Sequence, residues 1–90
     1  MIVKNVFIRT RHMRITDMRK QVTAIIEREN NGYVSLCPEL DIASQGDSVE
    51  EARDNLREAI ELFFEFASSS EIQNRFHEEI YITRLDVAAR

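Results

Sequence analysis

Residues 32–59 read GYVSLCPELDIASQGDSVEEARDNLREA and carry the densest structural signal in this 90-residue chain. An alternating segment turns at Pro38 and passes through Gly46 into a segment with helical periodicity. Proline lacks an amide hydrogen and favours extended geometry in the residue before it, so the alternating segment ends or bends at this corner. Ser48 and Glu51 have the spacing of a capping box, which places the start of a helix directly after Gly46.

Apolar residues follow Ser48 at spacings that are typical of a helix lying on a sheet. They are Val49, Ala52, Leu56, Ala59, Ile60, Phe63 and Ala67. Leu62 and Phe66 lie to one side of this stripe, so the second half of the helix carries more apolar surface than one sheet face needs. We therefore expect Leu62 and Phe66 to lie in a contact between subunits.

The rest of the chain supplies the strands. Four segments have the alternation or the β-branched and aromatic composition of strands, namely residues 21–29, 33–37, 41–45 and 79–87. Residues 71–79 predict a short second helix before the last strand. The order strand, strand, strand, helix, strand predicts an α+β fold of two layers, in which a sheet packs on one main helix.

The turn at residues 30–32 sets the register of the first two strands. A three-residue loop pairs Ile26 with Leu36 and keeps apolar residues on one face, whereas a two-residue loop ending at Gly32 would place Glu27 opposite Leu36. The longer loop is therefore predicted, with Gly32 as its left-handed residue.

Charge is unevenly distributed along the chain. Residues 1–20 hold six basic residues and one acidic residue, whereas residues 21–90 hold six basic and fifteen acidic residues, and the net charge is −4. An acidic body attracts basic proteins and repels nucleic acid, whereas a basic segment is able to contact phosphate. Residues 1–17 are expected to be a solvated extension that is dispensable for folding, separate from a single domain at residues 18–90.

The sequence argues against catalytic and metal sites. Cys37 is the only cysteine, and His12 and His77 are the only histidines, which leaves too few ligands for a closed zinc site. A lone thiol before a proline in a strand predicts a buried and unreactive group. Glycine occurs only at positions 32 and 46, so a phosphate-binding loop is excluded. We expect no catalytic residue, no metal and no cofactor, and hence a protein that is not an enzyme.

Size and cysteine content indicate the assembly and the compartment. A chain of 90 residues leaves much of its surface exposed, so self-association into a dimer or tetramer is expected. The single cysteine suits a reducing cytoplasm. Residues 1–20 contain no apolar run long enough for a signal sequence or a membrane span, so no membrane association is expected.

The pattern around Pro38 resembles the HicB family, the antitoxins of bacterial and archaeal HicA–HicB toxin–antitoxin pairs. The matching motifs are Thr23-Ala24-Ile25-Ile26-Glu27, Gly32-Tyr33-Val34, Cys37-Pro38-Glu39-Leu40, Ser44-Gln45-Gly46-Asp47-Ser48, Glu50-Glu51-Ala52 and Asn55-Leu56-Arg57-Glu58-Ala59. The resemblance covers residues 19–87. It implies a trimmed ribonuclease-H-like sheet of β-β-β-α-β order without catalytic acids.

The resemblance also implies a function. Members of that family neutralise a small basic RNA-cleaving toxin by covering its active-site histidine, so a HicA-like toxin encoded nearby is the expected partner. Many members carry a further C-terminal DNA-binding module, which is expected to be absent here, so direct DNA binding is not expected. The alternative is an oligomeric regulator that contacts nucleic acid through its basic N-terminal extension.

Three residues near the Pro38 corner are the candidate contacts with such a toxin. The predicted register places Tyr33 on the polar face of the sheet, where a rigid aromatic ring supplies contact area. Glu39 and Asp41 flank the corner, and carboxylates at such a place pair with Arg or Lys. The alternative is that Tyr33 covers the hairpin while the two carboxylates cap the turn. Structural turns and caps are assigned to Gly32, Pro38, Gly46, Ser48 and Glu51, and Gly46 is expected to take a positive φ.

Overall fold

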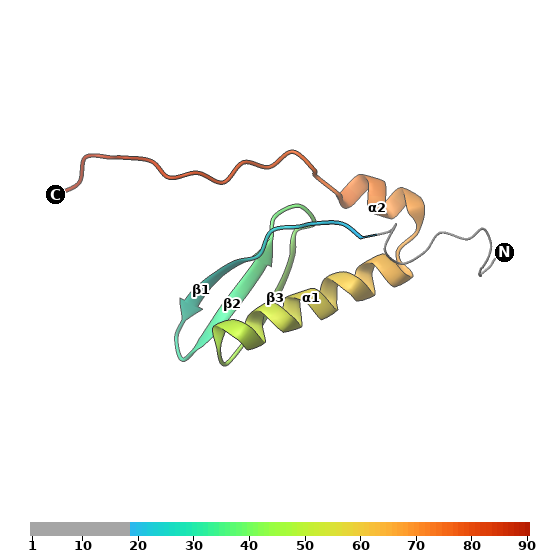
Figure 1. Cartoon of the computed structure of the whole chain (residues 1–90), viewed down its shortest axis with the longest axis horizontal. Helices are drawn as coiled ribbons and strands as arrows, with labels where there is room; N and C mark the ends of the chain where they lie inside the picture. The colour runs from blue at the N-terminus through green and yellow to red at the C-terminus, as the bar shows by residue number, and fades with distance from the viewer. Residues whose placement is uncertain (1–18) are drawn as a thin grey trace.

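The computed structural model describes residues 19–90, and the predicted extension at residues 1–17 lies outside them. The described elements are β1 (Ile25–Glu29), β2 (Gly32–Cys37), β3 (Ile42–Gly46), α1 (Val49–Phe66) and α2 (Ser69–Arg75). The strands form an antiparallel sheet in the order β1-β2-β3, and α1 packs against one face of it (Figure 1). The predicted α+β class, with one main helix and a short second helix, is confirmed.

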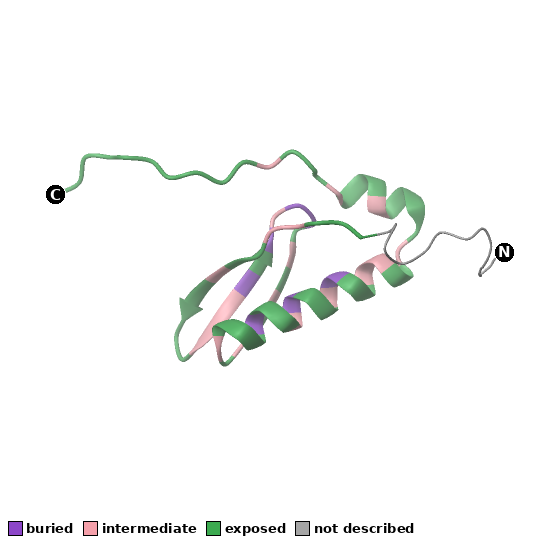
Figure 2. Ribbon diagram, viewed as in Figure 1, coloured by how far each residue is buried: buried purple, intermediate pink, exposed green. Residues whose placement is uncertain are grey.

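A small core lies between α1 and the sheet. α1 buries Ala52, Leu56 and Ile60, which belong to the predicted apolar stripe. Leu56 and Ile60 pack with the buried side chains of Cys37 and Leu40, which come from the end of β2 and the turn after it. Figure 2 shows the buried positions along the side of α1 that faces the sheet. The stripe therefore places the helix as its periodicity predicts.

The register of the first hairpin differs from the prediction. β1 and β2 are joined by the two-residue loop Asn30-Asn31, so Ile25 rather than Ile26 lies opposite Leu36. Asn30 takes the left-handed conformation with φ 57°. Asparagine enters this region more readily than other non-glycine residues. The predicted three-residue loop was wrong because it gave the left-handed position to a glycine.

The two glycines allow neighbouring backbone segments to pack closely, and neither adopts a left-handed conformation. No glycine among residues 19–90 has a positive φ, so the predicted conformation of Gly32 was wrong. A Cβ atom on Gly46 would lie 2.5 Å from the amide nitrogen of Ala52, and one on Gly32 would lie 2.9 Å from the carbonyl oxygen of Gly46. Both positions need glycine because another stretch of backbone approaches them closely.

The face of β2 that α1 covers is the reverse of the predicted one, whereas Ile26 of β1 lies on the covered side as predicted. Ser35 is buried, and its hydroxyl donates to the carbonyl oxygen of Ala52 at 2.8 Å, whereas Leu36 on the opposite face is exposed. Because Ala52 of α1 lies close to β2 at this point, a small residue is needed at position 35. Grouping residues by hydrophobicity therefore assigned the two faces of β2 incorrectly.

The predicted cap of α1 is present in part. The Ser48 hydroxyl accepts a hydrogen bond from the Glu51 amide at 3.0 Å, as predicted. The Glu51 carboxylate accepts from the Asp47 amide at 2.7 Å, one residue before the cap. A complete capping box occurs instead at α2, between Ser68 and Glu71. Each box satisfies backbone amides that have no partner inside the helix.

The chain leaves the body after α2 as an extended C-terminal arm, residues 77–90 (Figure 1). Its start is fixed, because the His77 amide donates to the carbonyl oxygen of Glu39 at 2.8 Å. The strand predicted at residues 79–87 pairs with no strand of its own chain within the described part of the protein. This is the main departure of the single chain from the predicted fold.

Candidate protein-binding surfaces

The turn between β2 and β3 is held by backbone hydrogen bonds. The amides of Leu40 and Asp41 both donate to the carbonyl oxygen of Cys37, at 3.3 and 2.8 Å. Asp41 ends the turn with φ 56°, a left-handed conformation that aspartate tolerates. Asp41 is exposed, so it is available for the predicted contact with a partner.

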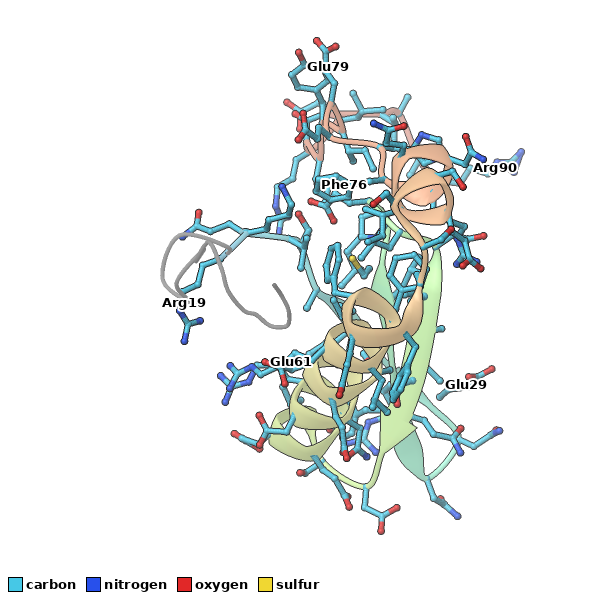
Figure 3. The ribbon with its side chains drawn as sticks, turned by 90° about the vertical axis from the view of Figure 1, so that its right-hand side faces the viewer. Arg19, Glu29, Glu61, Phe76, Glu79 and Arg90 are labelled. Atoms are coloured by element: carbon cyan, nitrogen blue, oxygen red, sulfur yellow. The ribbon has the colours of Figure 1, made fainter. Side chains whose placement is uncertain are left out.

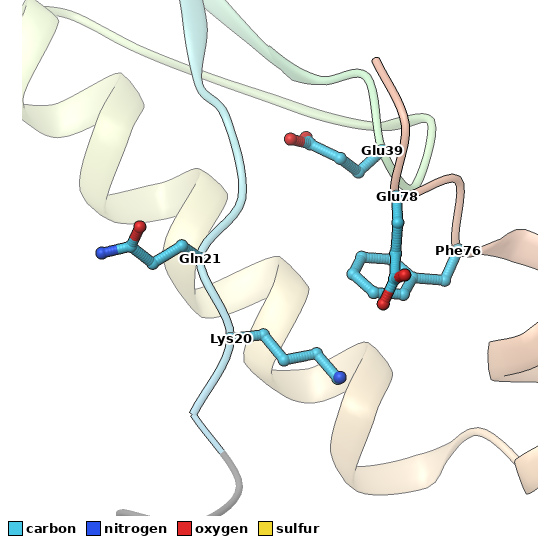
Figure 4. Close-up of a pocket in the computed structure, with 5 residues that line it drawn as sticks. All are labelled: Lys20, Gln21, Glu39, Phe76 and Glu78. Carbon is cyan, nitrogen blue, oxygen red and sulfur yellow. The ribbon is translucent and has the colours of Figure 1, made fainter.

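Glu39 belongs to the interior of the turn. Its side chain is only 8% exposed and points toward the chain that leads into β1 (Figure 4). The carboxylate accepts hydrogen bonds from the amide of Thr23 at 2.9 Å, from its hydroxyl at 2.7 Å and from the Cys37 thiol at 3.4 Å. Burial raises the pKa of Glu39, but the bonds from Thr23 outweigh burial and hold the pKa below 4.5. This geometry favours a structural role for Glu39 over the predicted contact.

Tyr33 lies at the far end of β2 from this turn. It is half-buried on the helix-covered face, next to Gly46, and not on the uncovered face where it was predicted. The guanidinium of Arg28 lies 4.8 Å from the ring centroid and donates to the phenol oxygen at 2.6 Å. Cys37 lies four positions further along the strand than Tyr33, a distance of about 13 Å. The structure therefore does not gather Tyr33, Glu39 and Asp41 into one patch.

Cys37 is an interior residue. Its side chain is fully buried, and burial raises the pKa of the thiol. A thiol with a raised pKa and no solvent access is a poor nucleophile and a poor metal ligand. The predicted buried thiol is confirmed.

The outer side of α1 is an acidic face. Its exposed carboxylates are Glu50, Glu51, Asp54, Glu58, Glu61 and Glu65. Figure 3 shows Glu61 on the side of the helix away from the sheet. The ion pair of Arg53 with Asp54, at 3.3 Å, is more than half exposed and neutralises little of this charge. A rigid helix thus presents a ridge of negative charge to the solvent.

Leu62 and Phe66 form an apolar flank on α1. Their side chains are 48% and 76% exposed. Asn55 lies on the same side of the helix and donates to the carbonyl oxygen of Gln45 at 2.8 Å, which places this flank on the β3 side of the molecule. The predicted subunit contact of Leu62 and Phe66 stays a prediction, and their exposure is what such a contact requires.

A second apolar surface crosses the uncovered face of the sheet. Ile25 pairs with Leu36, Leu36 pairs with Ala43, and all three side chains are exposed. This row was not predicted from the sequence, because Leu36 was assigned to the core. The alternation of Ile25 with Glu27 and Glu29 is the signal that marks β1 as a strand with one side in water.

A shallow open hollow lies between the start of the arm and the chain leading into β1. Its volume is about 260 Å³ and it is lined by Lys20, Gln21, Glu39, Phe76 and Glu78 (Figure 4). The ammonium of Lys20 lies 5.2 Å from the ring centroid of Phe76. Among residues 19–90, no three His, Cys, Asp or Glu side chains are grouped to hold a metal ion, and no helix has the length and apolar character needed to cross a membrane.

Two curated proteins resemble this chain in sequence. The UPF0150 protein ssl0738 of Synechocystis sp. is 46% identical over 50 residues, which cover 53% of this chain and 69% of that protein. A UPF0150 protein of Helicobacter pylori is 35% identical over 68 residues, which cover 74% of this chain and 94% of that protein. No family model and no solved structure matches the chain. The extent of these two alignments shows that the chain belongs to the UPF0150 family.

Proposed function

We propose that this protein is a HicB-like antitoxin that acts in the cytoplasm, without catalysis or a cofactor, by covering the active surface of a small basic RNA-cleaving toxin. Membership of UPF0150 and the HicB-like motifs in residues 23–59 support the proposal. The observation that carries it is the acidic face of α1, a ridge of exposed carboxylates on a rigid element.

The acidic face fits a partner that binds RNA. A protein that cleaves RNA presents Lys and Arg to phosphates, so its active surface has a positive potential. A ridge of opposite charge steers the two proteins together and disfavours wrong partners. Occlusion needs no nucleophile, which agrees with the burial of Cys37 and with the use of the Glu39 carboxylate inside the turn. Asp41 is the predicted contact residue at the turn that remains exposed.

We also propose that the working form is a homo-oligomer, a dimer or tetramer, with a sheet of β-β-β-α-β order and ribonuclease-H-like topology. The exposed flank of Leu62 and Phe66 supports association. The strand-like composition of residues 79–87 supports a fourth strand. That strand has no partner within its own described chain, so oligomer and fourth strand belong to the same proposal.

Co-expression with the HicA-type toxin from the neighbouring gene tests the function. The wild-type protein is expected to restore growth and to bind the purified toxin. A variant with Glu58→Lys and Glu61→Lys on the acidic face is expected to lose rescue while circular dichroism shows an unchanged fold. The control, Glu27→Lys with Glu29→Lys, makes the same charge change on the exposed end of β1 and is expected to retain rescue.

The outcomes separate the parts of the proposal. Full rescue by the α1 variant would remove the acidic face as the contact surface. Failure of the wild-type protein to bind or rescue would remove the antitoxin function itself, and regulation through the basic N-terminal extension would become the better account.

A further inference from the structure

We propose that two copies of this protein exchange their C-terminal arms, each arm adding residues 79–87 as a fourth strand to the outer edge of β1 in the other copy. The inference rests on the homo-oligomer of the proposed function and does not depend on toxin binding. The occupant of the β1 edge is therefore a defined segment of a second, identical chain.

The arm has the surface of a strand that lacks its sheet. Tyr81, Leu85 and Val87 are 81%, 79% and 75% exposed, and Ile82 is also exposed. In extended backbone, alternate residues share a side, so Tyr81, Leu85 and Val87 line one side together. Figure 2 shows the arm exposed along almost all of its length. A row of large apolar side chains in water is a surface that binds something.

The start of the arm is held firmly beside the chain that leads into β1. Phe76, at the end of α2, packs edge-on against Phe64 with 6.2 Å between ring centroids. The ammonium of Lys20 lies 5.2 Å from the centroid of the Phe76 ring (Figure 4). The Glu39 carbonyl then accepts from the His77 amide, while the Glu39 carboxylate accepts from Thr23. The arm is thus anchored at the end of the sheet where β1 begins, and from there it diverges from β1 and extends beyond the sheet (Figure 1).

β1 offers the open edge. Within the described residues, no strand pairs with its outer side. Ile25 is exposed on one face of β1 and Ile26 is half-buried on the other, so an added strand would find apolar neighbours on both faces. The β3 edge is partly occupied, because Asn55 already bonds the carbonyl oxygen of Gln45. Strand addition to an exposed edge satisfies backbone donors and acceptors that water otherwise covers.

A second copy of this chain is a better partner for the arm and the β1 edge than a different protein. The apolar core of the described chain consists of Cys37, Leu40, Ala52, Leu56 and Ile60, and a core of this size leaves a small domain marginally stable. Reciprocal exchange covers both arms and both β1 edges through one two-fold axis, so neither chain keeps an unpaired strand. The same contact also extends the row of Ile25 and Leu36 on the uncovered face.

Cross-linking of the full-length protein tests the exchange. One chain carries Thr83→Cys in the arm and another carries Glu27→Cys in β1. The two are unfolded together, refolded and treated with a short bismaleimide, while the native Cys37 is buried and does not react. The expected product is a covalent dimer between the two different chains. Replacing Glu27→Cys by Gln45→Cys on β3 is the matched control and is expected to give little product.

Sedimentation of a chain that ends at Glu79 and carries Leu62→Ser and Phe66→Ser gives the second measurement. The two substitutions remove the other proposed subunit contact, and the full-length protein with the same substitutions is the reference. The shortened chain is expected to be monomeric at concentrations where this reference is dimeric. A dimer that persists without the arm would overturn the proposal, and linkage through Gln45→Cys in place of Glu27→Cys would overturn the choice of edge. A further variant carries Glu27→Cys and Thr83→Cys in the same chain, and its internal linkage as a monomer would show that the arm pairs with its own β1. Toxin binding plays no part in either measurement, so this inference and the antitoxin function fail independently.

Discussion

Glu39 links the stability of the fold to pH. In the folded chain the bonds from Thr23 hold its pKa below 4.5, so the native state binds the proton less readily than the unfolded chain does. This stabilisation is complete above pH 4.5 and is lost as the pH falls through the lower pKa of the folded state. We expect Glu39→Gln to lower the free energy of unfolding by about 1 to 3 kcal/mol at neutral pH.

Urea unfolding of both proteins at neutral and acidic pH checks this prediction. The gap between them is expected to narrow in acid, because the wild type loses the contribution that the variant already lacks. Glu58→Gln, at an exposed position on α1, is the control and is expected to change little at either pH. A gap that does not narrow in acid would contradict the role of Glu39.

Gly46 shows how a residue type was predicted correctly for the wrong reason. The sequence analysis expected a positive φ, but the structure shows that Gly46 is required by the approach of Ala52, whose amide nitrogen would lie 2.5 Å from an added Cβ. At an unstrained site, Gly→Ala stabilises a protein by about 0.4 to 1 kcal/mol. We expect Gly46→Ala to destabilise by about 1 to 3 kcal/mol instead, because backbone atoms have to move.

Thermal and urea unfolding of Gly46→Ala measure the sign of this effect. Asn30→Gly is the opposite control, because Asn30 does have a positive φ and glycine adopts that conformation without strain. It is expected to be neutral or slightly stabilising. Stabilisation by Gly46→Ala would show that α1 does not lie as close to β3 as described.

At the scale of elements, sequence predicted what local periodicity determines and failed where tertiary contacts decide. The helix was predicted well because Ala52, Leu56 and Ile60 repeat with the helical period, and Ser48 marks its start. The hairpin register and sheet face were wrong because α1 packs against Ser35 and not against Leu36. No rule based on hydrophobicity alone selects a serine for the covered face. The shift of one residue followed directly from that choice.

The candidate contacts failed to converge for the same reason. Tyr33 is close to the Pro38 turn in the sequence, but it lies at the end of β2 that is far from this turn. Glu39 has a carboxylate that could pair with a basic group of a partner. In the structure it is bonded to Thr23 instead, because of the path by which the chain enters β1. The sequence alone does not show that Thr23 lies next to Glu39. Asp41 kept its predicted exposure because it ends a tight turn.

Arg75 is the residue that holds α2 on the turn. Its guanidinium donates to the carbonyl oxygens of Leu40 at 2.7 Å and Asp41 at 3.1 Å, and lies 5.5 Å from the ring centroid of Phe63. We expect Arg75→Ala to cost about 1 to 2 kcal/mol, since charged donors form the stronger hydrogen bonds but this side chain is partly in water. Amide hydrogen exchange is expected to quicken first in α2.

Arg75→Lys serves as the matched variant, since it keeps the charge but not the planar group that reaches two carbonyl oxygens. Its stability is expected to fall between those of the wild type and Arg75→Ala. Equal stability of the lysine variant and the wild type would mean that charge alone, and not the paired hydrogen bonds, fixes α2.

At the scale of the whole molecule, the acidic surface and the apolar surfaces lie in different places and are suited to different contacts. The carboxylates of α1 lie on the side of the helix away from the sheet (Figure 3), whereas the β1 edge belongs to the sheet and the apolar arm leaves the body after α2 (Figure 1). Self-association through the arm would therefore leave the acidic face free. The acidic balance of residues 21–90 is evident from the sequence, but this separation is not, because it depends on where the arm leaves the body.

This separation leads to a prediction about rates. If the acidic face steers a cationic toxin, its contribution lies mainly in the association rate constant and is screened by salt, since the Debye length is about 10 Å at 0.1 M salt and about 3 Å at 1 M. We expect a variant with Glu58→Gln, Glu61→Gln and Glu65→Gln to associate with the toxin several-fold more slowly in low salt and at nearly the wild-type rate in high salt. Its own sedimentation is expected to be unchanged.

Stopped-flow binding across a range of salt concentrations measures this prediction. The control replaces Leu62 and Phe66 by Ser, which removes apolar surface without changing charge and is expected to leave the salt dependence of association intact. If the slower association of the Gln variant persists in high salt, the carboxylates act through direct contacts and not through steering. If the Gln variant associates as fast as the wild type in low salt, the toxin does not approach the acidic face of α1, and the contact has to be sought on the exposed side of the Pro38 turn around Asp41.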